Sequence, residues 1–162
     1  MRILGIDPGS LHTGYGVIER HGSALKVVEA GRISCARDLP LPARLAHLAD
    51  GLAGLLARQP PDLAVLETPF HGMNARSLIV LAQARGALLA VLAGRGLEIR
   101  EYSPAEVKSA VTGNGRADKG QVARMVRLLL AADGDWASDA TDALALAICC
   151  AQRLRLDRLR DR

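Results

Sequence analysis

The sequence predicts a mixed α/β domain, and two strands that each end on a carboxylate carry most of this prediction. The first is the short apolar run at residues 2–7, which Pro8 and Gly9 break, and residues 13–18 follow at hairpin distance as an antiparallel strand. The second, residues 63–67, repeats the pattern of an apolar run, an acid and then a proline. Because a predicted helix separates the two, the connection is a crossover and the second strand should run parallel to the first.

The remaining elements follow from hydrophobic periodicity and from the residues that start and stop helices. They are a strand at residues 25–33, a helix at 45–56 after a polar connection at 37–42, a helix at 75–94, a strand at 97–102, a short helix from a capping box at 103–106 to near residue 111, a helix that opens at Lys119, and a last helix with Asp139 in its first turn. We expect residues 1–155 to form one domain and residues 156–162 a basic tail that frays.

The composition is that of a soluble globular protein with a polyanionic partner. Hydrophobic residues make up 49% and charged residues 23% of the 162 residues, and the net charge is +4. No apolar run reaches the ~20 uninterrupted residues that span a bilayer, so no membrane partner is expected. Met1 leads directly into the first strand, so no signal peptide is expected either. Three cysteines without metal or disulfide spacing favour the reducing cytoplasm.

Asp7 and Glu67 are the first candidate site residues. If their strands are parallel neighbours, roughly 4.8 Å apart, both acids lie at the carboxyl edge of the sheet, where α/β proteins bind ligands. Two carboxylates so close repel each other, and a divalent cation between them relieves the repulsion. The simpler alternatives are that Asp7 caps the turn that follows it and that Glu67 is a surface residue.

Asp139 and Asp142 add a second pair of acids. They are three residues apart, so they share one face at the start of a helix that is otherwise apolar. A helix-capping role explains Asp139 but not a second acid on the same face. Four carboxylates that converge in this way are the ligands that hard divalent ions prefer.

Three further stretches leave two interpretations open. Phe70, the only phenylalanine, follows Glu67 in a glycine-containing loop, where it either stacks on a nucleic-acid base or anchors the loop. Lys108 and Lys119 flank a glycine loop that contains Asn114, either as a phosphate track or as a solvated surface. The helix at 75–94 is too apolar for one buried face, so it lies in the core or at a subunit interface.

Several motifs together resemble one family. They are GIDPGS, TGYGVI, the LE that ends the fourth strand, NARS, QARG, VK followed by TGNGRADKGQV, and ATDALALA. In this order they are similar to the RuvC family of bacterial Holliday junction resolvases, over almost the whole chain. The resemblance implies a ribonuclease H-like fold, with a five-stranded mixed sheet of order 3-2-1-4-5 flanked by helices.

The resemblance also assigns roles to residues. It implies that Asp7, Glu67, Asp139 and Asp142 are the catalytic, metal-binding acids, although some members have a histidine in the last helix where this chain has Asp142. The implied DNA contacts are Phe70 (the intercalating aromatic), Arg76, Lys108, Asn114 and Lys119.

The implied activity is that of a crossover junction endodeoxyribonuclease in recombination and DNA repair. Two Mg²⁺ or Mn²⁺ ions per site would serve phosphodiester hydrolysis, which leaves 5′-phosphate ends at paired, symmetrical nicks in four-way DNA junctions. The implied partners are a second copy of the chain and the RuvA–RuvB branch-migration complex. We expect the dimer to form through the helix at 75–94, with Leu81 and Leu88 in the interface and small residues (Ala82, Ala84, Gly86, Ala87) allowing close approach.

Two other functions are weighed against this one. An actin-like ATPase also opens with a strand, an Asp-x-Gly turn and a Thr-Gly hairpin, but it needs two such lobes and this chain has one. A non-catalytic junction-binding module would not need all four acids.

Overall fold

The computed structural model describes residues 1–68 and 74–160, with side chains up to Arg155. Its five strands form one mixed sheet of order β3-β2-β1-β4-β5, as the resemblance implied. The strands are β1 (Arg2–Asp7), β2 (His12–His21), β3 (Ala24–Ser34), β4 (Leu63–Glu67) and β5 (Glu98–Tyr102). The helices are α1 (Leu41–Arg58), α2 (Ala75–Gly94), α3 (Pro104–Thr112), α4 (Lys119–Leu130) and α5 (Ser138–Arg160).

The pairing of the strands brings the two strand-end acids together. β1 and β2 pair antiparallel, as do β2 and β3, whereas β1 and β4 pair parallel. Ile6 lies opposite Leu66 in the β1–β4 pair, so the next residue of each strand is an acid, Asp7 or Glu67. The crossover prediction is therefore confirmed.

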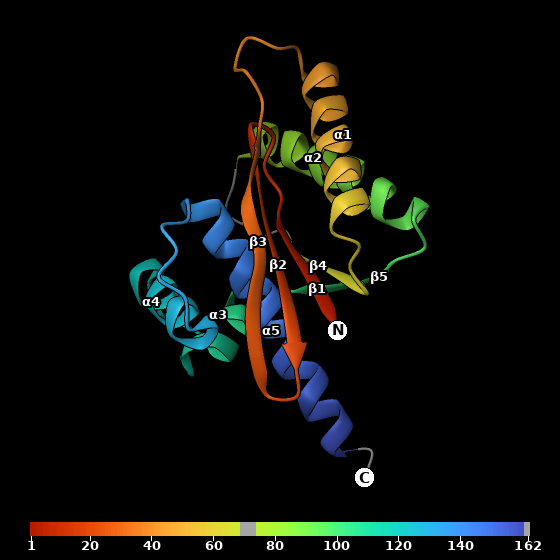
Figure 1. Cartoon of the computed structure of the whole chain (residues 1–162). Coiled ribbons are helices and arrows are strands. Elements are labelled where there is room, and N and C mark those ends of the chain that lie inside the picture. Colours follow the sequence, from red (N-terminus) through yellow and green to blue (C-terminus); the bar gives the residue numbers. More distant parts are fainter. Residues whose placement is uncertain (69–73, 161–162) are drawn as a thin grey trace.

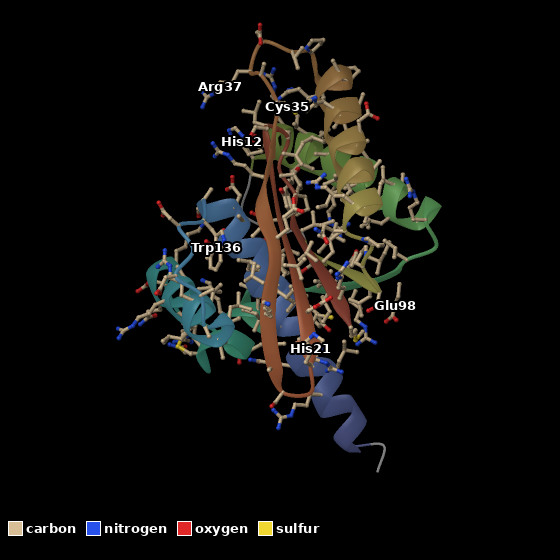
Figure 2. The ribbon with its side chains drawn as sticks, in the orientation of Figure 1. His12, His21, Cys35, Arg37, Glu98 and Trp136 are labelled. Carbon is tan, nitrogen blue, oxygen red and sulfur yellow. The ribbon has the colours of Figure 1, made fainter. Side chains whose placement is uncertain are left out.

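Helices cover both faces of the sheet (Figure 1). On one face, α1 and α2 pack on Leu4, Ile6 and Leu66. On the other, α3, α4 and α5 pack on Ile3 and Val65, and Trp136 in the segment before α5 joins this cluster (Figure 2). Side chains of β1 alternate between the two clusters, as the period of two in a strand requires.

The last helix lies close to the sheet because two strand residues have no side chain. A Cβ atom on Gly5 would stand 1.9 Å from the carbonyl oxygen of Ala143, and one on Gly14 would stand 2.0 Å from that of Asp139. Neither position leaves room for even a methyl group. The glycines thus set the depth at which α5, and with it Asp139 and Asp142, rests on β1 and β2.

Among the boundaries that differ from the predictions, two lie at the ends of helices next to predicted irregular segments. The segment at residues 37–42 was expected to be a connection, but α1 already begins at Leu41. Pro42 lies in the first turn of α1, where its fixed φ suits a helix and its missing N–H is not needed. At the other end α5 continues to Arg160, so it includes part of the segment expected to be a tail; the fraying of residues 156–162 stays a prediction.

Much of α2 lies open to solvent in the single chain. Among the described residues, α2 is the one helix that is long enough and apolar enough to cross a membrane, judged by length and composition only. Only 17% of its most apolar stretch is buried inside the chain. Its buried face consists of Ala84, Leu88 and Leu92, which pack in the α1–α2 cluster. Leu88 is therefore a core residue, and its prediction as an interface residue is wrong. The exposed residues of α2 that form a stripe at helical spacing are Ile79, Ala82, Gly86, Ala90 and Ala93.

Candidate active site

Asp7 and Glu67 end adjacent parallel strands, and the turn after Asp7 is held by a buried threonine. The Thr13 hydroxyl donates to the carbonyl oxygen of Gly9 (3.0 Å) and accepts from the Gly9 amide (3.4 Å). Thr13 is only 1% exposed, so these two bonds satisfy a hydroxyl that would otherwise be buried without a partner. The turn that follows Asp7 is thereby fixed to the start of β2.

Three of the four acids line one cavity, and the fourth lies one helical turn away. Asp7, Glu67 and Asp142 line a cavity of about 520 Å³, together with Lys108 and Lys119. Asp139 stands one turn earlier on α5, where its main chain touches Gly14, and its charge acts on Asp7. The structure therefore brings together the four acids that the sequence singled out.

The electrostatics of the cavity favour a bound cation. The pKa of Asp7 is raised from 3.8 to about 7. Burial is the largest cause, and the negative charges of Asp142, Glu67 and Asp139 contribute the rest of the increase. Burial and the Asp142 charge also raise the pKa of Glu67. The donor set consists of carboxylate oxygens, which suit hard divalent ions, and such an ion would relieve the repulsion. The residues present therefore fit a divalent metal.

Two of the acids are paired with basic side chains. Lys119 Nζ lies 3.3 Å from Asp142 Oδ2, and Arg32 Nη1 lies 4.0 Å from Asp139 Oδ2. Within the described part of the chain, no group of three or more His, Cys, Asp or Glu side chains is already arranged to hold a metal ion. The labelled histidines and cysteine lie elsewhere: His12 and Cys35 are near one end of the β2–β3 ribbon and His21 near the other (Figure 2).

The predicted DNA contacts fall in different places. Lys108 and Lys119 line the acid cavity. Arg76 lines a second cavity, of about 410 Å³, with Gly9 and Ser10 just beyond Asp7 and with Ser77 at the start of α2. Asn114 is exposed between α3 and α4, and its side-chain oxygen accepts from the Arg116 amide, so it orders its own loop. Phe70 lies outside the described residues, and its role stays a prediction.

Sequence reasoning missed two arginines beside the acids. Arg32 was placed on a strand without a role, yet it lies opposite Gly14 in the β2–β3 pair and reaches Asp139. Arg85 belongs to the QARG motif, but the motif does not indicate that its side chain contacts the main chain of Glu67. The strand register would have located Arg32, whereas Arg85 required the packing of α2 on the sheet.

Comparison with known proteins assigns the family. The family model for "Crossover junction endodeoxyribonuclease RuvC" matches residues 3–150. The chain belongs to the RuvC family. Among RuvC relatives, that of Anaeromyxobacter sp. (strain K) is 51% identical over 92% of this chain and 80% of its own length. That of Bordetella parapertussis is 47% identical over 98% of this chain and 90% of its own length.

Solved structures agree with the RuvC assignment. T. thermophilus RuvC in complex with a Holliday junction substrate superimposes with a TM-score of 0.91 at 28% identity, covering 97% of this chain and 96% of that one. This likeness bears out the ribonuclease H-like sheet order. Membership of the RuvC family favours neither the actin-like ATPase nor the non-catalytic module.

The raised pKa of Asp7 predicts how stability depends on pH. Since the folded state holds this proton more tightly than the unfolded chain, the contribution of Asp7 to stability falls as pH rises from 3.8 to about 7 and is then constant. Asp7→Asn removes this loss. In EDTA, we expect the melting temperature of the variant to exceed that of the wild type by at least about 3 °C at pH 8, with a smaller excess at pH 5.

Thermal denaturation at the two pH values measures this difference. Adding Mg²⁺ at pH 8 should raise the melting temperature of the wild type and leave that of Asp7→Asn nearly unchanged. An excess that is the same at pH 5 and pH 8 would contradict the assigned pKa.

Proposed function

We propose that this RuvC-family chain is a Holliday junction resolvase that hydrolyses DNA phosphodiester bonds at the cavity lined by Asp7, Glu67 and Asp142. The observation that carries the proposal is the meeting of four acids at the carboxyl edge of the sheet, with a pKa of about 7 for Asp7. A non-catalytic junction-binding module has no need of such costly repulsion. Membership of the RuvC family supports the same conclusion.

In the proposed site the four acids hold two Mg²⁺ or Mn²⁺ ions. Asp7 is the central ligand because it is the acid whose pKa responds to the charges of all three others. Glu67, Asp139 and Asp142 complete the set. Ions held by these acids would supply an activated water and charge stabilisation for the leaving 3′ oxygen, and hydrolysis of this kind would give 5′-phosphate ends.

The basic residues of the site provide attraction for the DNA backbone. Lys108 and Lys119 line the acid cavity and lie on the α3–α4 side of it. The Lys119 side chain is 80% exposed, so it can contact a phosphate at the cavity mouth. Arg76 and Ser77 extend the basic and polar surface past Gly9 to the start of α2. Phe70 is proposed to wedge between bases next to Glu67, and Asn114 to contact the backbone from its loop.

A four-way junction with fixed arms, compared with a linear duplex of one arm, tests the proposed function. We expect nicks in the junction, none in the duplex, and none in either when EDTA replaces Mg²⁺ or Mn²⁺. A DNA ligase should seal the products, because hydrolysis leaves 5′-phosphate and 3′-hydroxyl ends. Equal cleavage of the duplex, or cleavage in EDTA, would contradict the proposal.

We also propose that the enzyme works as a two-fold homodimer joined through the exposed stripe of α2. One chain offers one set of acids, whereas resolution needs two nicks in symmetry-related strands. The stripe residues Ala82, Gly86 and Ala90 are small, and a Cβ atom on Gly86 would meet nothing within the chain. A second α2 can therefore approach closely at this surface.

Ile79→Glu tests the dimer, since Ile79 is 60% exposed in the single chain and lies in the stripe. A carboxylate buried in an apolar interface should raise the dimer dissociation constant by at least about a hundredfold, which is about 2.7 kcal/mol. Sedimentation should show a folded monomer, and a cruciform plasmid should be nicked singly rather than linearised.

Leu128→Glu on α4 is the matched control. Leu128 is 63% exposed but lies on the opposite face of the sheet from α2, so this variant should remain a dimer. A dimeric Ile79→Glu, or a monomeric wild type that makes paired nicks, would contradict the proposed interface.

The family resemblance further implies the RuvA–RuvB branch-migration complex as a partner and the cytoplasm as the location. All three free cysteines are buried, which fits a reducing compartment. Co-purification of the chain with RuvA and RuvB on a synthetic junction is the direct test of the partner.

A further inference from the structure

Arg85 is an almost buried arginine directly behind the active site. It lies in the middle of α2, and its side chain is 13% exposed. Its Nε donates to the main-chain carbonyl oxygen of Glu67 at 3.3 Å, and its Nη2 forms an ion pair with Glu101 of β5. An arginine held this far from water is costly unless its hydrogen bonds are needed where they are made.

The carbonyl that Arg85 contacts belongs to the last residue of β4. β4 ends at Glu67, whose partner on β5 is Tyr102, and the amide of Thr68 still donates to the Tyr102 carbonyl at 2.9 Å. The Nε atom of Arg85 therefore binds the last strand residue of β4. The Nη2 atom of the same guanidinium binds the neighbouring strand, β5, through Glu101.

Fixing this carbonyl also fixes the Glu67 carboxylate. The carbonyl carbon and the side chain are both bonded to the Cα atom of Glu67, so a shift of the end of β4 would move the carbonyl and the carboxylate together. The planar guanidinium, with two donors fixed relative to each other, restrains such a shift better than a single ammonium group does.

We propose that Arg85 is a positioning residue, which clamps the ends of β4 and β5 and so holds Glu67 in the geometry that binds a divalent ion. The inference rests on the proposed function for the role of Glu67. It also gives α2 two roles: its exposed stripe faces the second subunit, and Arg85 on the same helix supports the active site. The dimer helix and the metal site are thus in direct contact.

Arg85→Met tests the clamp, because methionine keeps the length and apolar packing of the side chain but makes neither hydrogen bond. Arg85→Lys keeps a positive charge beside Glu101 but loses the pair of donors that the planar guanidinium holds in fixed positions. We expect Arg85→Met to weaken Mn²⁺ binding by calorimetry about tenfold or more, the range found for residues that orient metal ligands, and Arg85→Lys to fall between it and the wild type. Junction binding in EDTA should not change, and excess Mn²⁺ should restore cleavage.

A second readout needs no metal. Hydrogen exchange of the Thr68 amide, which bonds to Tyr102, should speed up at least about tenfold in metal-free Arg85→Met if the end of β4 is released. Arg95→Met, a change at an exposed arginine just beyond α2, is the control and should alter neither measurement.

The two readouts separate the inference from the proposed function. Wild-type exchange at Thr68 in Arg85→Met would overturn the clamp, whatever the metal results are. Faster exchange with unchanged Mn²⁺ affinity would overturn the role in metal binding. If the wild type binds no Mn²⁺ at all, the proposed function is contradicted, and the exchange data alone still decide whether Arg85 holds the strand end.

Discussion

Asp7→Asn is expected to lower the rate of junction cleavage by at least about 10³-fold and to leave junction binding intact. A metal ion contributes several kcal/mol to the transition state, and about 4 kcal/mol corresponds to about 10³ in rate. Asp7 is the acid on which the other three charges act, so its replacement removes the ligand at the centre of the set. The loss of one negative charge does not weaken attraction for phosphate. Single-turnover cleavage and a gel-shift titration in EDTA measure the two effects.

Asp50→Asn is the matched control for this change. Asp50 is exposed on α1, away from the acid cavity, so the variant should cleave at the wild-type rate. An Asp7→Asn enzyme that cleaves within about tenfold of the wild type would mean that Asp7 is not a metal ligand. Loss of junction binding in step with cleavage would instead indicate a structural role.

Gly14→Ala is expected to have the next largest effect, although Gly14 has no functional group. The added Cβ atom would stand 2.0 Å from the carbonyl oxygen of Asp139 and 2.9 Å from its Cβ atom. A helix backbone cannot yield as a flexible side chain does, so the start of α5 must move away from β2. A misplacement of about 1 Å can cost about 10²-fold in rate, and overpacking costs about 1–3 kcal/mol of stability.

We therefore expect Gly14→Ala to cleave junctions about a hundredfold more slowly, with a melting temperature lower by several degrees. Gly54→Ala provides the control, since a Cβ atom there would meet only the Arg58 side chain at 3.9 Å. In the middle of α1 this change should stabilise the fold by roughly 0.5–1 kcal/mol and leave cleavage unchanged. A fully active, stable Gly14→Ala protein would show that the contact between α5 and β2 does not position Asp139.

Local patterns were enough to predict the strands and the edge of the sheet where the acids meet. The apolar runs that end on Asp7 and Glu67 are buried on both faces, so their sequences carry a clear signal. The spacing of Asp139 and Asp142 likewise placed both on one face of α5. The order of the five strands came from the resemblance, because hydrophobicity does not distinguish which strand edges pair.

The outer surface of α2 could not be predicted for a related reason. Apolar residues occur on every side of this helix, so periodicity did not separate its core face from its exposed stripe, and Leu88 was assigned to the wrong one. Arg85 was missed because it donates to a main-chain carbonyl, a partner that leaves no trace in the sequence. Contacts of this kind depend on how elements pack together.

We propose that four acids of one chain form a site for two divalent ions that serves junction cleavage. The direct test of this site is calorimetric titration with Mn²⁺. The protein is first bound to a junction that carries non-hydrolysable linkages at the cleavage points. We expect two ions per subunit for the wild type and fewer than one for Asp7→Asn, with Asp50→Asn like the wild type. Equal Mn²⁺ binding by the wild type and Asp7→Asn would contradict the proposal.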